Sequence, residues 1–290
     1  MHPYRPRTPY WILPWTVLLF LPLVWTGCAS AVAGRFADSL SAAILDANDL
    51  ETVETGGPAY LLMIDGFLRE DPHDESLLLS AANLYAAYAG LYVTDPARKR
   101  KLTDKALDYA LTAFCIRNRK GCDLRKASFE DFRKTVAAAK TADVPVIYTL
   151  GATWAAWIEA HRDDWDAVAE ISRVDALMTR VIALDEGYRD GGAHQYLAIL
   201  ATLLPPALGG RPEIGRHHFE RAVALSEGKN LMVKVTYARR YARLVFDRGL
   251  HDRLLTEVIE ADPEVAGHTL VNTMAQKEAR LLLDNADDYF

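Results

Sequence analysis

Apolar residues recur at helical spacing along most of this chain, and that spacing limits the fold more than any other feature does. One stripe consists of Leu77, Ala81, Leu84, Tyr88 and Leu91. Steps of three and four residues place such side chains on one face of a helix. No run of alternating β-branched residues competes with this pattern. The sequence therefore predicts an all-α fold of about eleven or twelve helices.

Aspartate–proline pairs at residues 71–72, 95–96 and 262–263 fit the beginnings of helices. Aspartate suits the N-cap, and proline suits the first helical position because the N–H it lacks has no partner there. The expected spans are 35–49, 58–70, 73–92, 96–118, 126–140, 145–161, 164–184, 188–204, 212–226, 230–246, 248–260 and 268–285.

Several of these helices end in similar sequences, which indicates a repeat. Residues 180–185 resemble residues 221–226 at an offset of 41, near the 34-residue period of tetratricopeptide helix hairpins. The chain has 43 alanines among 290 residues, and small side chains let paired helices approach closely. We therefore expect a tetratricopeptide-like hairpin array in one domain at residues 35–290. The alternative is a non-repetitive helical bundle.

Residues 1–27 have the features of a bacterial export signal. Two arginines precede an apolar stretch from Trp11 to Trp25, which is too short for a stable membrane-spanning helix. The small residues before Cys28 resemble a lipobox, in which the cysteine is acylated and becomes the new N-terminus. Residues 28–34 would then be a tether, and Ala29 favours sorting to the outer membrane with the body facing the periplasm. The alternative is an ordinary signal peptide cleaved near Ala29 or Ala31.

The charge of the chain argues against nucleic acid as a partner. The net charge of −6 becomes −8 when the two arginines of residues 1–27 are removed. An acidic body is also not attracted to anionic lipid by its own surface, so membrane association would depend on the anchor.

The sequence contains no motif for a cofactor, a metal site or a catalytic nucleophile. The acids Asp163, Asp164 and Asp166 suit the start of a helix, although such a cluster could also form a metal site or supply carboxylates for catalysis. An enzyme could use Asp163, Asp164 or His194. His194 follows two glycines, which indicates either a turn with a packed histidine or a ligand site. His217 and His218 are adjacent, and we expect them at the surface or at a helix cap.

Two further features have both a structural and a functional interpretation. Cys115 and Cys122 are expected to form a disulfide in an oxidising periplasm, unless both are reduced structural cysteines. The aromatic stripes are most simply core, but a helical array can enclose an apolar channel that they would line. The candidate lining residues are Tyr85, Tyr88, Tyr148, Trp154, Trp157 and His194.

Several segments in order resemble the TatT family, the T-component of tetratricopeptide-associated TRAP (tripartite ATP-independent periplasmic) transporters. The matching segments are residues 65–69, 84–90, 148–157, 184–188, 191–194, 208–213, 218–222 and 272–290. The resemblance extends over nearly all of residues 28–290.

This resemblance implies a non-catalytic lipoprotein that forms a homotrimer with a channel through each protomer. It also implies association with a periplasmic solute-binding protein, the P-component, and an apolar or amphipathic ligand, with no cofactor. Two other hypotheses remain at this stage. One is a general tetratricopeptide scaffold lipoprotein for envelope assembly, and the other is the enzyme described above.

Overall fold

The computed structural model describes residues 39–40 and 42–290, and the second range forms one compact unit. Its elements are helices, with no strand in the part described, which confirms the predicted all-α fold. The helices of the first half are α3 (Leu50–Glu70), α4 (Glu75–Tyr92), α5 (Pro96–Arg117), α6 (Phe129–Ala137) and α7 (Val144–Ala160). Those of the second half are α8 (Trp165–Ala169), α9 (Ile171–Leu184), α10 (Tyr188–Ala201), α11 (Pro212–Leu225), α12 (Leu231–Tyr237), α13 (Arg248–Glu260), α14 (Thr269–Asp284) and α15 (Ala286–Tyr289).

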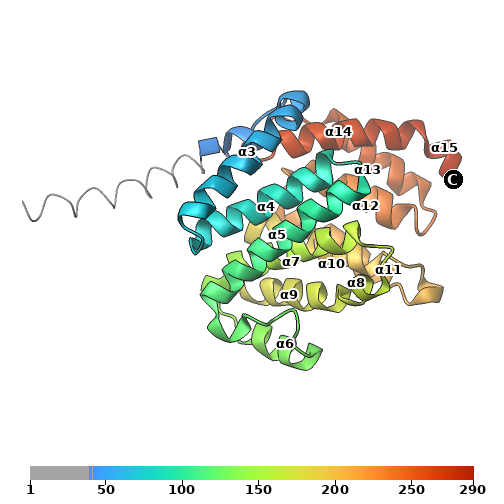
Figure 1. Cartoon of the computed structure of the whole chain (residues 1–290). Coiled ribbons are helices and arrows are strands. Elements are labelled where there is room, and N and C mark those ends of the chain that lie inside the picture. Colours follow the sequence, from blue (N-terminus) through green and yellow to red (C-terminus); the bar gives the residue numbers. More distant parts are fainter. Residues whose placement is uncertain (1–38, 41) are drawn as a thin grey trace, which may run out of the picture. The chain divides into compact units, whose positions relative to one another are not determined.

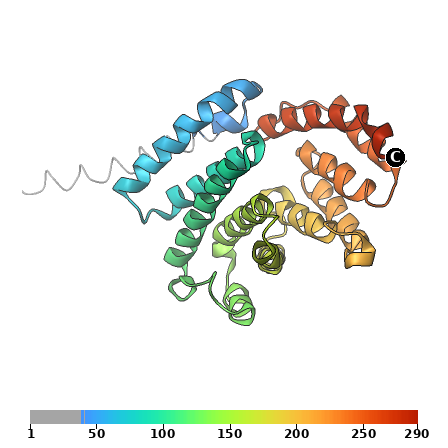
Figure 2. The same ribbon diagram turned by 45° about the vertical axis from the view of Figure 1, so that its right-hand side comes forward.

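The helices pack as successive antiparallel hairpins, as the repeat predicts. The pairs are α4 with α5, α7 with α9, α10 with α11, and α12 with α13 (Figure 1). The first helices of successive hairpins also contact one another, α4 against α7 and α7 against α10, and α12 contacts α14. We call α4, α7, α10, α12 and α14 the inner helices, because the array curves around them (Figure 2).

The two ends of the array meet within residues 42–290. Helix α14 contacts α3, and the short segment before α3 bonds to the segment before α14 (Figure 2). There the Asn48 amide donates to the Glu264 carboxylate at 3.1 Å, and the Gly267 N–H donates to Asp46 at 2.5 Å. The hairpin array therefore closes on itself.

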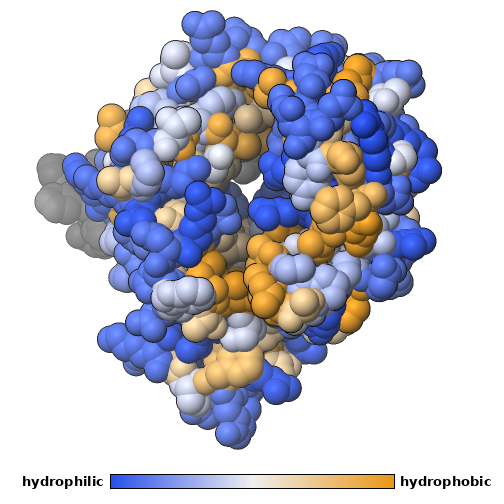
Figure 3. Space-filling model, turned by 90° about the vertical axis from the view of Figure 1, so that its right-hand side faces the viewer, coloured by the Kyte–Doolittle hydropathy of each residue, from blue (hydrophilic) through white to orange (hydrophobic). Residues whose placement is uncertain are grey.

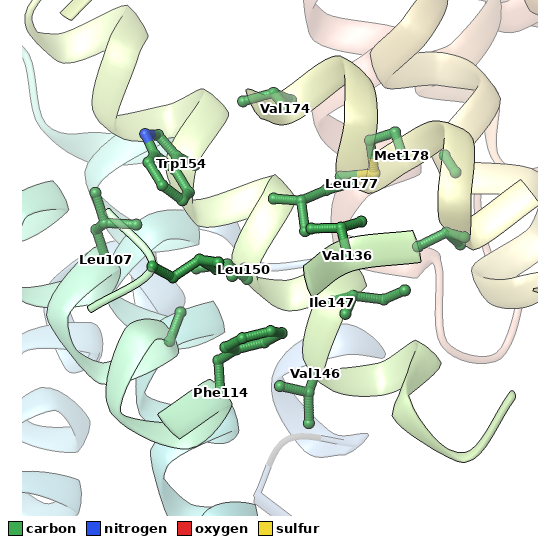
Figure 4. Close-up of a cluster of buried hydrophobic side chains, with 14 of the residues drawn as sticks. Leu107, Phe114, Val136, Val146, Ile147, Leu150, Trp154, Val174, Leu177 and Met178 are labelled. Atoms are coloured by element: carbon green, nitrogen blue, oxygen red, sulfur yellow. The ribbon is translucent and has the colours of Figure 1, made fainter. Parts of the chain in front are cut away.

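The largest core cluster lies where α5, α7 and α9 meet (Figure 4). Leu107, Leu150 and Leu177, one from each of these helices, have no exposed surface. Alanines occupy many of the helix crossings, and Ala81, Ala82, Ala106 and Ala110 are likewise fully buried between α4 and its neighbours. Burial of this apolar surface is the main stabilising contribution, because helices without a packed face are marginal in water.

Helix α3 begins eight residues earlier than predicted and contains Pro58 in its interior. A proline in this position has no N–H for the carbonyl of residue 54. The Tyr88 hydroxyl donates to that Glu54 carbonyl at 3.3 Å, and Gly57 leaves room for the Tyr88 ring. The predicted start at residue 58 is wrong because a side chain from α4 replaces the missing hydrogen bond.

Only one of the three aspartate–proline pairs caps a helix in the expected way. The Asp95 carboxylate accepts from the Arg98 N–H at 2.8 Å, and Pro96 begins α5. Asp71 instead ends α3, and α4 begins two residues later than predicted under the cap of Asp74. Residues 262–263 lie in the irregular segment between α13 and α14. An aspartate–proline pair therefore predicts that the chain changes direction nearby, but it does not predict the first residue of the next helix.

Three other predicted helices are interrupted. The span 164–184 divides at Glu170 into α8 and α9, and 230–246 passes from α12 into a π-helical turn at Ala238–Ala242. The span 188–204 begins with a left-handed turn and ends at Ala201.

The expected signal peptide 1–27, the tether 28–34 and the lipidation site Cys28 lie outside the described residues. Among the helices that the structure does describe, none has the length and apolarity needed to cross a membrane.

Candidate functional site: an aromatic wall on the inner helices

Hydrogen bonds join successive inner helices. The Asn83 amide on α4 donates to the Thr149 hydroxyl on α7 at 3.4 Å, and Gln195 on α10 donates to Thr236 on α12 at 3.5 Å. The molecular surface is hollowed at the centre of the face shown in Figure 3, and hydrophobic residues gather along one border of that hollow.

Three tyrosines form an aromatic cluster on α7 and α10, which we call the tyrosine cluster. The Tyr148 ring packs edge-to-face against Tyr188 at a centroid distance of 5.2 Å and against Tyr196 at 6.1 Å. Edge-to-face contact is a favoured geometry because the positive edge of one ring meets the negative face of the other. The three rings therefore form one packed aromatic cluster.

The hydroxyls of Tyr148 and Tyr196 differ from those of tyrosines that serve only as core. Both side chains are half-buried, and neither hydroxyl has a hydrogen-bond partner among the described residues or is completely enclosed. Burial nevertheless raises the pKa of Tyr148 well above its ordinary value and that of Tyr196 to about 12. Each hydroxyl is therefore unbonded within the described protein and lies in largely apolar surroundings.

A left-handed turn opens α10 next to this cluster. Arg189, Asp190 and Gly191 have φ values of 50°, 56° and 75°, which non-glycine residues adopt at a cost. A Cβ on Gly191 would lie 2.6 Å from the Leu225 side chain, and one on Gly192 would lie 2.3 Å from the Tyr148 hydroxyl. The two glycines therefore permit a close approach of the turn to α7 and α11.

A contact with the segment before α14 also holds this turn in place. The Asp190 carboxylate lies 3.1 Å from His268 Nε2, in the segment that precedes α14. This contact connects the second half of the array to the region where the array closes.

A histidine pair lies behind the turn. His194 Nδ1 and His218 Nδ1 are 2.8 Å apart, and His194 Nε2 is 3.2 Å from Glu186. Arg221 binds both oxygens of Glu186 at 2.7 Å. Burial, followed by the neighbouring His194, lowers the pKa of His218 to about 4, and burial also lowers that of His194. Both imidazoles are therefore neutral at pH 7 and share one N–H···N hydrogen bond.

His217 and His218 were both expected at the surface or at a helix cap. His217 is exposed, whereas His218 is half-buried. His194 is 4% exposed and faces His218 and Glu186 rather than a free space. No group of three or more residues in the described chain has the arrangement needed to hold a metal ion.

The other predicted lining residues lie in the core. Tyr85 is 3% exposed and donates to Asp65 at 2.7 Å, while Lys105 donates to the Tyr85 hydroxyl at 3.0 Å. Tyr88 is 8% exposed and completes α3 as described above. Both tyrosines therefore have structural partners that account for their hydroxyls.

The two tryptophans of α7 are buried as well. Trp154 has no exposed surface and donates to Glu170 at 2.5 Å, and Trp157 donates to Asp104 at 2.7 Å. Each indole N–H thus fixes α7 to a neighbouring element. Of the six residues predicted to line a channel, Tyr148 alone has an accessible hydroxyl without a partner.

The remaining sequence-predicted residues are dispersed. Asp163 pairs with Arg100 at 2.6 Å, and Asp164 caps α8 by accepting from the Asp166 N–H at 2.9 Å. Neither contacts His194, so the three residues do not form one catalytic site. Cys115 and Cys122 are joined by a disulfide that links the end of α5 to the following turn.

Sequence reasoning missed Tyr188, Tyr196 and the partnership of His194 with His218. The tyrosines flank the glycine pair at 191–192, and that flanking position was the available signal. The histidine pair had none, since the two residues are 24 positions apart on different helices.

The fold and the inner wall define an all-α protein of the tetratricopeptide-like class, in which a closed hairpin array carries an aromatic wall on its inner helices. The chain belongs to the TRAP transporter T-component family, whose model matches residues 46–290. A comparison with curated proteins finds no match. Family membership makes the chain an accessory component of a TRAP transport system and associates it with the cell envelope.

Proposed function

We propose that this chain is a non-catalytic lipoprotein that docks a TRAP solute-binding protein and passes an apolar or amphipathic ligand through the hollow of its helix array. Acylation at Cys28 would hold the body at the outer membrane, facing the periplasm, and the functional form would be a homotrimer. The binding protein would deliver solute toward the membrane permease. No step of this function requires a cofactor or a covalent reaction.

The tyrosine cluster is the observation that carries the ligand part of the proposal. Its rings offer apolar surface, and the hydroxyls of Tyr148 and Tyr196 offer two hydrogen-bonding groups that the described protein does not use. Most small-molecule sites combine an apolar lining with a few such polar groups. An amphipathic molecule satisfies both, because its chain contacts the rings and its polar end meets the hydroxyls.

A binding titration with cis-parinaric acid tests this proposal on the purified mature protein. The fluorescence of this probe rises when it leaves water for an apolar site, so saturable enhancement is expected. Tyr148→Trp places a larger ring beside Tyr188 and Tyr196 and is expected to weaken binding about tenfold.

The matched control is Trp165→Tyr, the reverse exchange at a side chain that is 85% exposed at the start of α8. It is expected to bind the probe like the wild type. Unsaturable binding by the wild type, or equal affinities for all three proteins with unchanged thermal melts, would contradict the ligand part. A general scaffold for envelope assembly would give that result.

A further inference from the structure

A groove lies on the outer side of the array, away from the tyrosine cluster. It runs between α6 and α9, is bordered by Leu200 of α10 and Arg211 before α11, and has a volume of about 720 Å³. Its floor is apolar and includes Val136, Ile171 and Ala176. Helix α6 projects from the array and packs against α9 (Figure 1), so it forms one free-standing wall of the groove.

Three arginines border this groove, and none of them forms an ion pair with a carboxylate in the described part of the chain. These are Arg133, Arg180 and Arg211, and the single acid among the lining residues is Asp175. Elsewhere on the surface many cations are paired, for example Arg100 with Asp163 and Arg248 with Asp287. A cluster of unpaired cations is unexpected on a chain of net charge −6.

Arg180 is fixed in position beside the groove. Its guanidinium donates to the Ala139 carbonyl, and its Nε is buried without a hydrogen-bond partner. Burial of an unsatisfied charged donor is unfavourable. The guanidinium also lines the groove, so a carboxylate bound there meets a cation that is already held in position.

Apolar side chains extend the groove on both sides. Phe129, at the start of α6, lines it with 42% of its surface exposed. On the other side, Leu200 and Arg211 flank a loop that exposes 49% of Leu204 and 68% of Leu208. The Arg211 N–H donates to the Ala201 carbonyl at 2.8 Å, which closes the base of this loop. Such grouped apolar exposure is typical of a protein-binding surface.

We propose that this groove, which we call the arginine groove, binds an acidic amphipathic helix of the TRAP solute-binding protein. The apolar floor between two helices suits the apolar face of a third helix, and the unpaired arginines suit carboxylates along its edge. This inference rests on the docking function proposed above and adds the surface and the chemistry of the contact.

Binding measurements with a TRAP solute-binding protein from the same bacterium test the assignment. The mature chain is immobilised, and the dissociation constant is measured by biolayer interferometry at low and high salt. The double variant Arg133→Glu with Arg211→Glu is expected to bind at least about tenfold more weakly, with a smaller salt dependence. Both residues are exposed, so the fold should be retained, which circular dichroism and thermal melts check.

Arg253→Glu with Arg280→Glu is the matched control. It makes the same charge change at exposed positions of α13 and α14 that lie outside the groove. It is expected to bind within about twofold of the wild type, because distant exposed charges are screened. Phe129→Ala tests the apolar wall independently of charge and is also expected to weaken binding.

The outcomes distinguish this assignment from the docking proposal. Wild-type affinity in the Arg133/Arg211 variant would overturn the groove assignment and leave docking intact. No binding by the wild type would overturn docking and this inference together. If the variant binds its partner normally but no longer sediments with phosphatidylglycerol vesicles, the groove is a lipid site. If its mass by sedimentation changes instead, the groove is a contact between copies, and either result contradicts the proposal.

Discussion

Single residues in this protein have roles that their helical spacing alone does not reveal. The spacing predicted that Tyr88 lies on the apolar face of its helix, and it is indeed buried. The spacing could not show that its hydroxyl serves the carbonyl of Glu54, because that partner is 34 positions away on another helix. Position on a face follows from local sequence, whereas the partner of a polar atom depends on how the helices assemble.

The neighbouring tyrosines of α4 provide a matched test at this scale. Tyr88→Phe is expected to lower the free energy of unfolding by about 1 kcal/mol, because the carbonyl opposite Pro58 loses its donor. Tyr92→Phe is expected to be neutral or stabilising, because the Tyr92 hydroxyl is buried without a partner. Urea denaturation measures both. Equal destabilisation by the two variants would contradict the assigned role of Tyr88.

The histidine pair predicts a pH dependence of stability. The folded pKa of His218 is about 4, below the ordinary 6.5, so between these values the unfolded chain binds a proton that the folded chain does not. The free energy of unfolding should therefore fall as the pH drops from about 6.5 to 4. Linkage sets the largest slope from this one group at about 1.4 kcal/mol per pH unit.

His218→Asn keeps a polar side chain near His194 but does not titrate. Thermal melts between pH 4 and 7 are expected to show a shallower decline in this variant than in the wild type. His217→Asn, one position earlier and exposed, is the control and should keep the wild-type decline. A parallel decline in all three proteins would contradict the coupling of this pair to folding.

At the scale of elements, the sequence predicted which segments are helices more reliably than where they begin. The apolar spacing gives a helix its buried face, and burial decides whether it forms. Boundaries depend on caps and on tertiary partners, which is why α3 continues through Pro58 and α8 separates from α9. The left-handed turn at 189–191 is invisible to periodicity, although its glycine pair was a signal of irregular backbone.

A comparison of Gly191 in that turn with Gly228 elsewhere distinguishes the cost of backbone strain from the cost of crowding, because the two glycines have nearly the same φ. Gly228 has φ +76° and open space around it, so Gly228→Ala should cost about 1 kcal/mol from strain alone. Gly191 has φ +75° but faces Leu225, so Gly191→Ala should cost a further 1–3 kcal/mol or so. Urea denaturation of the two variants measures the difference. Equal costs would mean that the contact with Leu225 does not hold the turn.

At the scale of the whole molecule, a hairpin array could be predicted, but its closure could not. Closure joins Asp46 to Gly267 and Asn48 to Glu264, pairs more than 200 positions apart that no local pattern connects. The tyrosine cluster was likewise predictable only in part. Tyr148 was predicted to line a channel, whereas its partners Tyr188 and Tyr196 became apparent only when α10 was seen to pack beside α7.

Membrane attachment is predicted to depend on one residue of the N-terminal segment. If Cys28 is acylated, Cys28→Ser should move the protein from the membrane fraction to the soluble fraction, since acyl chains supply the affinity and an acidic body supplies none. Ser30→Ala is a control that leaves the cysteine intact. Detergent partitioning of envelope fractions measures the distribution. Retention of the Cys28→Ser variant in the membrane would contradict the anchor.

Native mass spectrometry of the mature protein, purified without added ligand, tests the central claim most directly. The account predicts a fraction of molecules with extra mass from an apolar or amphipathic compound, which organic extraction should release. Tyr148→Trp should deplete this fraction, and Trp165→Tyr should leave it unchanged. A bare protein mass in the wild type, or the same bound fraction in the wild type and in Tyr148→Trp, would contradict passage of a ligand along the tyrosine cluster.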